Sequence, residues 1–270
     1  MRVNSQEQIA FSTNRSKRNS TEIEKSLQKL SSGLKIAKGS HNASGLAISE
    51  TVRMQVRGLA QAQRNMQDGL SLVESVNEGL NNISGLLQRS RELAVMNANG
   101  TLTDNDRESS EKELVQLLAA IDDTAGKMAF NTKKILGENG SLILQVGANP
   151  TQQITINLFD IGTTALGLED ATLVSQEKAT ELITKLGNAV QIVTNQLTNI
   201  GSDMESIEHH LRYVMLYETN LTHSLSLLED TDTAKEMMNF ISGDIRQKGD
   251  HLLVNHVNQN VQGVLSLFSK

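Results

Sequence analysis

The 270-residue chain contains no cysteine, no tryptophan, a single proline, two tyrosines and five phenylalanines. Without cysteine it can form neither a disulfide bond nor a thiolate metal site. The shortage of large aromatic residues argues against an ordinary globular core, because such residues normally fill one. Since Pro150 is the only proline, the chain can carry long uninterrupted helices.

Patterns that would mark nucleic-acid, membrane or signal-peptide functions are also missing. The net charge of −6 comes from 25 basic and 31 acidic residues, interspersed along the chain. This gives no electrostatic case for nucleic acid or an anionic membrane as partner. No run of about 20 apolar residues could span a membrane. The polar first twenty residues lack the apolar stretch of a signal peptide, so we expect any export to use another route.

The six histidines form no recognisable metal motif. His209 and His210 are adjacent and would point about 100° apart on a helix, while His251 and His256 are five residues apart. No HExxH, GxGxxG, GxxxxGK[ST] or GxSxG sequence is present. We therefore expect no enzymatic activity, no cofactor and no metal site.

An apolar stripe near the N-terminus predicts a first helix. The stripe is spaced four, three and four residues, as on one helix face. It stops at "AKGSHN", residues 37–42, where Gly39 suits a helix C-terminus and Ser40 or Asn42 the cap of the next helix. The stretch predicts a helix–turn–helix corner. The stripe consists of Ile23, Leu27, Leu30 and Leu34.

The next helix is predicted to run from about residue 44 to 98, with a seam of alternating four- and three-residue spacings typical of a coiled coil. Gln63 and Asn77 are polar members of this seam. They are either tolerated at partly exposed positions or they fix the register of packing. The seam consists of Val52, Val56, Leu59, Gln63, Met66, Leu70, Val73, Asn77 and Leu80.

The middle of the chain changes period. After a break at "NANGTLTDND", Thr103 or Asp104 could cap a third helix over about 104–129. Residues 141–159 then alternate apolar and polar side chains on either side of a Gly-Ala-Asn-Pro turn. That alternation predicts a small β-hairpin.

A second seam of five heptads follows on a helix over about 176–228, and only Glu218 interrupts it. The economical arrangement packs the two seams against each other. We therefore predict a mainly α fold: a long, antiparallel, coiled-coil-like helical rod over 44–228 that carries the hairpin. The second seam consists of Val193, Leu197, Ile200, Met204, Ile207, Leu211, Val214, Glu218, Leu221, Leu225 and Leu228.

The two ends of the chain lack an obvious partner in this arrangement. The C-terminal stripe of Met237, Ile241, Ile245 and Leu252 is interrupted by Gly243, Gly249 and Gly263. An amphipathic segment that cannot bury its stripe either stays disordered or packs on another copy. We therefore treat the two terminal segments as candidate assembly segments.

Several stretches together resemble bacterial flagellin. They are "KLSSGLKI", "NASGLAISETVRMQVRGL", "QDGLSLV", "LLQRSRELAVMNANGT", "FNTKKIL", "VGANPTQQITINL" and, more weakly, "DTDTAKEMMNFI" and "NQNVQGVLSLF". Flagellins usually carry a variable central insertion, and here almost nothing fills that place. The chain therefore resembles a minimal flagellin.

The resemblance implies a structural subunit that self-assembles into the helical flagellar filament for motility. It implies secretion through the flagellar export channel to the extracellular flagellum. It also implies partners: further copies of the chain, an export chaperone, and filament cap or junction proteins. Residues 1–36 and 232–270 would form the inner filament core, as helices that order on assembly, and residues 37–42 the connection to the rod.

Some flagellins are recognised by a Toll-like innate immune receptor, and the matching positions here are Arg89, Leu93 and Glu113. Ordinary solvated helix charges are the alternative interpretation of Arg89 and Glu113. The chain departs from the family at His41 and Asn42, where two aspartates are usual, and in both terminal segments. An alternative function is therefore a divergent paralogue, a minor or accessory filament protein that does not polymerise alone.

Two further classes fit less well. An enzyme carried on a flagellin scaffold would need the central insertion that this chain lacks. A coiled-coil signalling protein would not explain the central hairpin.

Overall fold

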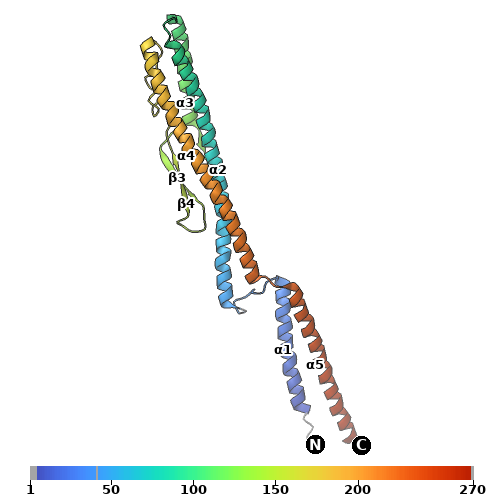
Figure 1. The fold of residues 1–270 in the computed structure, drawn as a ribbon. Helices are drawn as coiled ribbons and strands as arrows, with labels where there is room; N and C mark the ends of the chain where they lie inside the picture. The colour runs from blue at the N-terminus through green and yellow to red at the C-terminus, as the bar shows by residue number, and fades with distance from the viewer. Residues whose placement is uncertain (1–4, 41, 269–270) are drawn as a thin grey trace. The chain divides into compact units, whose positions relative to one another are not determined.

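The computed structural model describes residues 5–40 and 42–268; residues 1–4, His41 and 269–270 lie outside this description. The chain divides into two compact units, one formed by residues 55–219 and the other by the two ends, 1–54 with 220–270. Along the chain the elements are α1 (Ser5–Ser32), α2 (Ala43–Asn97), α3 (Asp104–Lys127), β1 (Ala129–Phe130), β2 (Lys133–Lys134), β3 (Gly140–Gln145), β4 (Gln153–Leu158), α4 (Gln176–Glu229) and α5 (Thr233–Phe268). Figure 1 shows them.

Helices α2 and α4 run antiparallel to each other. In the 55–219 unit, the Gln63 amide donates a hydrogen bond to Glu218 at 2.6 Å. In the other unit, the Arg53 guanidinium pairs with Glu229 at 2.5 Å. Within the 55–219 unit, α2 and α4 lie side by side in opposite directions, as Figure 1 shows. The predicted antiparallel, mainly α fold with a small β element is confirmed.

The core of the 55–219 unit follows the predicted seams. The α2 seam residues Leu59, Met66, Val73 and Leu80 are buried, and so are Val193, Ile200, Ile207 and Val214 of α4. The intervening seam positions are half-buried, among them Leu197 and Leu211. Alternate burial of this kind is typical of two helices that share one seam.

A second face of α2 packs against β3 and the segment around Met128. A Cβ atom added at Gly69 would lie 2.5 Å from a methyl carbon of Leu144 in β3, and one at Gly79 would lie 2.3 Å from the Met128 sulfur. Both distances are far below van der Waals contact, so glycine is what lets these segments approach the helix. The sequence did not predict this second contact face of α2, because the apolar seams predict only the face that packs against α4.

The predicted hairpin is confirmed as β3 paired antiparallel with β4, in a register that places Leu142 opposite Ile156 and Leu144 opposite Ile154. A second, smaller pair, β1 with β2, was not predicted. Its turn holds Asn131 and Thr132 at positive φ values of 48° and 69°. Such values are typical of two-residue hairpin turns. The turn was not predicted because the sequence has Asn-Thr there and no glycine.

The loop after the hairpin is fixed to α3. The Asp122 carboxylate accepts hydrogen bonds from the Thr163 backbone N–H at 2.8 Å and from its hydroxyl at 2.9 Å. Glu111 accepts a further hydrogen bond from the Leu173 N–H. Apolar side chains of the same loop are buried: Ile161, Leu166, Leu168 and Leu173.

Two helix boundaries were left open by the sequence, and the structure resolves both. Thr103 caps α3, and its hydroxyl accepts from the Asp106 N–H while the Asp106 carboxylate accepts from the Thr103 N–H. Asn42 caps α2, where its side-chain oxygen accepts from the Gly45 N–H at 2.9 Å. Both arrangements satisfy backbone donors that a helix start leaves unpaired.

The end of α1 was misplaced by the sequence analysis. The helix ends at Ser32, and Gly33 rather than Gly39 takes the left-handed conformation, with φ of 72°. Residues 33–36 then leave the helix because Leu34 forms a β-bridge with Asp230, and the Lys35 N–H donates to the Glu229 carbonyl at 2.6 Å. The chain breaks here so that its two halves can be joined by backbone hydrogen bonds.

Candidate functional site

The candidate assembly segments form a pair of helices in the unit of the two chain ends. Helix α1 packs along α5 in antiparallel orientation, as Figure 1 shows. Arg15 meets Asp250, Ile23 meets Gly243, and Ser26 meets Glu236. The expectation that neither terminal segment has a partner within the chain is therefore wrong in this structure. Each segment is the other's partner.

Polar groups make most of the specific contacts between α1 and α5. Arg15 Nε donates to Asp250 Oδ1 at 2.7 Å, and the Asn19 amide donates to Asp250 Oδ2 at 3.1 Å. The Asp250 side chain is only 1% exposed, so these two donors replace the water that the carboxylate loses. The hydrogen bond from Arg15 is the main cause that lowers the pKa of Asp250 below its usual value.

A second polar contact lies nearer the start of α5. The Ser26 hydroxyl donates to Glu236 Oε1 at 2.7 Å, and Lys29 Nζ lies 3.5 Å from the same carboxylate. The Ser26 hydrogen bond is the largest cause that lowers the pKa of Glu236. Because carboxylates and their donors must meet in pairs, these contacts fix the register of the two helices.

Sequence reasoning missed these contact residues because it searched for apolar stripes. The contact face of α5 repeats every seven residues through Glu236, Gly243 and Asp250, and Asn19 and Ser26 keep the same spacing on α1. A Cβ added at Gly243 would lie 2.9 Å from Ile23 Cγ1, so at this position glycine lets α1 and α5 approach closely. A heptad search that included small and polar residues would have found the face.

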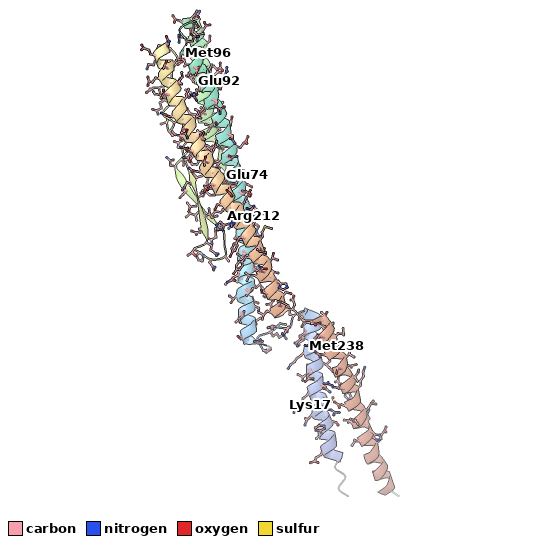
Figure 2. All side chains as sticks on the ribbon, viewed as in Figure 1. Lys17, Glu74, Glu92, Met96, Arg212 and Met238 are labelled. Carbon is pink, nitrogen blue, oxygen red and sulfur yellow. The ribbon has the colours of Figure 1, made fainter. Side chains whose placement is uncertain are left out.

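The apolar residues predicted for assembly lie mostly outside the α1–α5 contact. On α5, Met237, Ile241, Ile245 and Leu252 are all exposed. Met238 and Leu253 add to this surface, and Met238 is labelled in Figure 2. An exposed apolar strip of this length indicates a surface used for association. We call these six residues the α5 apolar strip.

The N-terminal stripe is divided between two environments. Ile23 faces α5, whereas Leu27 is 55% exposed and Leu30 and Leu34 are half-buried. Leu27 and Leu30 line a groove of about 820 Å³ together with Met237 and Phe240 of α5. The structure thus brings three of the eight predicted assembly residues into one apolar groove, and it adds Phe240, which the sequence analysis missed.

The candidate receptor-contact residues lie in the 55–219 unit. Arg89 and Glu113 are on α2 and α3, and the Arg89 guanidinium lies 2.8 Å from the Glu113 carboxylate. Arg89 also pairs with Glu92 at 3.0 Å. Both Arg89 and Glu113 keep a large share of their surface exposed, 51% and 42% of the side chain. They are therefore ion-paired with each other and still accessible.

Leu93 does not fit the same role. It is 2% exposed and belongs to the buried face of α2, so it offers no surface to a partner. The assignment of Leu93 as a receptor contact is corrected on this ground. Its apolar side chain stabilises the core beneath the exposed Arg89.

The described part of the chain offers no metal cluster and no membrane-spanning helix. There, no group of three or more histidine, aspartate or glutamate side chains is placed to bind a metal ion. None of the described helices is both long enough and apolar enough to cross a bilayer.

Comparisons with known proteins identify the family. The model of the bacterial flagellin N-terminal helical region matches residues 3–141, and that of the bacterial flagellin C-terminal helical region matches residues 183–268. The chain is 32% identical to flagellin of Bacillus subtilis (strain 168), over 99% of each protein. It is 33% identical to the flagellar filament 33 kDa core protein of Treponema phagedenis, over 91% of this chain and 92% of that one.

Solved structures agree with this. The crystal structure of Bacillus cereus flagellin is 32% identical, with a TM-score of 0.52, and the match covers 56% of this chain and 88% of that one. A flagellar hook-associated protein structure from Vibrio parahaemolyticus shares the fold, with a TM-score of 0.60 at 15% identity over 70% of this chain and 99% of that one. With both terminal regions matched and full-length relatives above 30% identity, the chain belongs to the bacterial flagellin family.

Proposed function

We propose that this chain enters the flagellar filament through helices α1 and α5, which lie in segments 1–36 and 232–270. As a flagellin it is a structural filament subunit for motility and not an enzyme. The observation that carries the proposal is the α5 apolar strip, whose members stay exposed although α1 covers another face of the same helix. Exposed apolar surface of this kind favours association with further copies.

The mode of association follows from the asymmetry of the surfaces. The α5 apolar strip and the groove lined by Leu27, Leu30 and Phe240 meet at Met237, but the rest of the strip, from Ile241 to Leu253, lies outside the groove. When two different patches meet, the contact is head-to-tail and can repeat without closing, which gives a helical filament. Related proteins named as filament core proteins support this assembly.

Export and accessory partners belong to the same proposal. We infer that the subunit leaves the cell through the flagellar export channel and forms part of the extracellular flagellum. On this route it would meet an export chaperone and the cap or junction proteins. Support comes from membership of the flagellin family.

Seeded growth tests the assembly proposal. Purified full-length chain is mixed with sheared filament seeds and elongation is followed by electron microscopy. Wild-type chain should elongate the seeds, whereas Ile241→Lys/Ile245→Lys should not, because it places two cations in the α5 apolar strip. The matched control is Asn239→Lys, an exposed position off the strip, which should elongate normally.

The divergent-paralogue alternative gives a different result. A chain that acts only as a minor or accessory protein would fail to elongate seeds of its own kind, yet would enter filaments when co-expressed with another flagellin. Failure in both assays would contradict the filament-subunit proposal.

We also propose that a Toll-like innate immune receptor contacts the surface around Arg89 and Glu113. The supporting observation is that this ion pair bridges two helices while remaining exposed. Arg89→Ala/Glu113→Ala should therefore lower receptor activation and leave the melting temperature nearly unchanged. Unchanged receptor activation by the folded double variant would exclude the contact.

A further inference from the structure

The turn between α2 and α3 contains an exposed Asn-Gly sequence, Asn99–Gly100, whose surroundings are unusual. In such a sequence the backbone nitrogen of glycine can attack the side-chain carbonyl carbon of asparagine. Two Asn-Gly sequences occur in the chain, the other being Asn139–Gly140. The chain therefore carries its own reference site for any reaction that depends on local structure.

One neighbour polarises the carbon that would be attacked. The Thr101 N–H donates a hydrogen bond to Asn99 Oδ1 at 3.3 Å. When a nucleophile adds to the carboxamide carbon, negative charge develops on this oxygen. A backbone donor already directed at the oxygen stabilises that charge, as donors do in an oxyanion hole.

A second neighbour acts on the attacking nitrogen. Arg107 Nη2 donates to the Asn99 backbone carbonyl at 3.0 Å, and Nη1 of the same guanidinium binds the Asn97 carbonyl. The Asn99 carbonyl and the Gly100 nitrogen belong to one peptide group. A cation bound to the carbonyl withdraws electron density from the nitrogen and makes its N–H easier to deprotonate, and the deprotonated nitrogen is the nucleophile.

The attack is also sterically open. In the part of the chain that the structure describes, the Gly100 N–H makes no hydrogen bond that would have to break first. A Cβ added at Gly100 would have as its nearest neighbour the Gln176 side chain, at 3.6 Å, so the turn is not crowded. Both residues are exposed, which gives water access to the product.

We propose that Asn99–Gly100 is a self-modification site at which Asn99 deamidates. The Gly100 nitrogen forms a bond to Asn99 Cγ, the bond from Cγ to the side-chain nitrogen breaks, and ammonia leaves with the proton from the Gly100 N–H. The product is a cyclic succinimide. Water then opens the ring at one of its two carbonyl carbons, which yields aspartate or isoaspartate at position 99.

The product changes the α2–α3 turn. A carboxylate at position 99 adds negative charge beside the Arg107 guanidinium, which donates to the Asn97 and Asn99 carbonyl oxygens. The isoaspartate form also lengthens the backbone by one methylene group. Subunits thus acquire a permanent mark with time, independent of their role in a filament.

At Asn139–Gly140 a backbone N–H also donates to the asparagine side-chain oxygen, but this donor comes from a distant segment and the glycine lies in a strand. The Asn139 side-chain oxygen accepts from the Asp160 N–H at 3.1 Å, which holds the carboxamide against a segment 21 residues away. Gly140 pairs with Leu158 in the hairpin, so its backbone is fixed in an extended strand. The strand pairing keeps the Gly140 nitrogen from turning toward the Asn139 side chain, whereas Gly100 lies in a turn.

The test compares the two sites within the same molecule. Full-length protein is incubated at mildly alkaline pH, and deamidation at each site is quantified by peptide mass spectrometry with isoaspartate detection. In the folded chain Asn99 should react roughly tenfold faster than Asn139. In concentrated urea the two rates should converge, because both sites then have the same Asn-Gly chemistry. Equal rates in the folded chain, or a ratio that urea leaves unchanged, would overturn the proposal.

Two variants separate the contributions. Gly100→Ala should slow reaction at Asn99 but not at Asn139, because the added Cβ hinders ring closure. Arg107→Gln should slow Asn99 selectively if the guanidinium activates the peptide nitrogen. Its melting temperature is measured in parallel, and faster deamidation in a folded Arg107→Gln chain would refute the role given to Arg107.

Discussion

The Gln63 side-chain amide donates a hydrogen bond of 2.6 Å to the Glu218 carboxylate, so the polar interruptions of two apolar seams meet each other. Both residues are half-buried. Of the two interpretations open for Gln63, fixing the register is the one this contact supports, since a shift of either helix would separate the pair.

A double-mutant cycle measures this contact. Gln63→Leu and Glu218→Leu should each destabilise the chain, because each leaves the other polar group beside an apolar side chain. The double variant should recover part of the loss, with a coupling free energy of about 1 kcal/mol from urea unfolding. Purely additive effects would show that the two residues do not interact in solution.

The buried seam of α4 gives a sharper test. Ile207 is fully buried, whereas Leu211, the seam centre by spacing, is half-buried. Ile207→Asp should therefore lower the free energy of unfolding by about 3–5 kcal/mol, because it buries an unpaired charge. His210→Asp, at an exposed position three residues away, is the control and should shift the melting temperature little. Similar losses for both variants would contradict the assignment of the seam.

Pairing of α1 with α5 can be tested by cross-linking, because the natural chain has no cysteine. Ile23→Cys/Gly243→Cys places two thiols where α1 and α5 are in close contact, and a disulfide should form within one molecule under mild oxidation. Ile23→Cys/Ile241→Cys is the control. Ile241 is exposed on the strip and should cross-link poorly. Equal yields would mean that the helices do not hold this register.

Acid should weaken the same pairing. The pKa of Asp250 is lowered in the folded chain, first by the hydrogen bond from Arg15, with smaller contributions from Asn19 and His251. Its stabilising contribution is thus complete above the ordinary aspartate pKa, near 3.8, and is lost as pH falls through the lowered folded value. Glu236, whose pKa is also lowered, adds to the effect in the same direction.

Energy transfer between dyes on Lys17→Cys and Lys248→Cys can follow this loss. The transfer should fall below about pH 4 in the otherwise wild-type chain. Asp250→Asn should give lower transfer at neutral pH and a smaller change on acidification. A variant with the full wild-type acid response would show that Asp250 does not control pairing.

The sequence by itself determined most of the secondary structure. Heptad spacing predicted α2 and α4, alternation predicted the β3–β4 hairpin, and Thr103 and Asn42 were among the candidate caps. These features are local, because helix periodicity, strand alternation and capping depend on residues a few positions apart. The α2–α4 pairing also followed, since two long seams of matching period have few other ways to be buried.

Tertiary structure alone decided the features that depend on distant residues. The pairing of α1 with α5 rests on Asp250 meeting Arg15 and Asn19, more than 200 positions away, and no local pattern announces it. Burial likewise separated Leu93 from the exposed Arg89, although both lie on one helix. The glycines at 69 and 79 allow β3 and the segment around Met128 to approach α2. In each case the free energy comes from groups brought together only by folding, so the chain order does not reveal it.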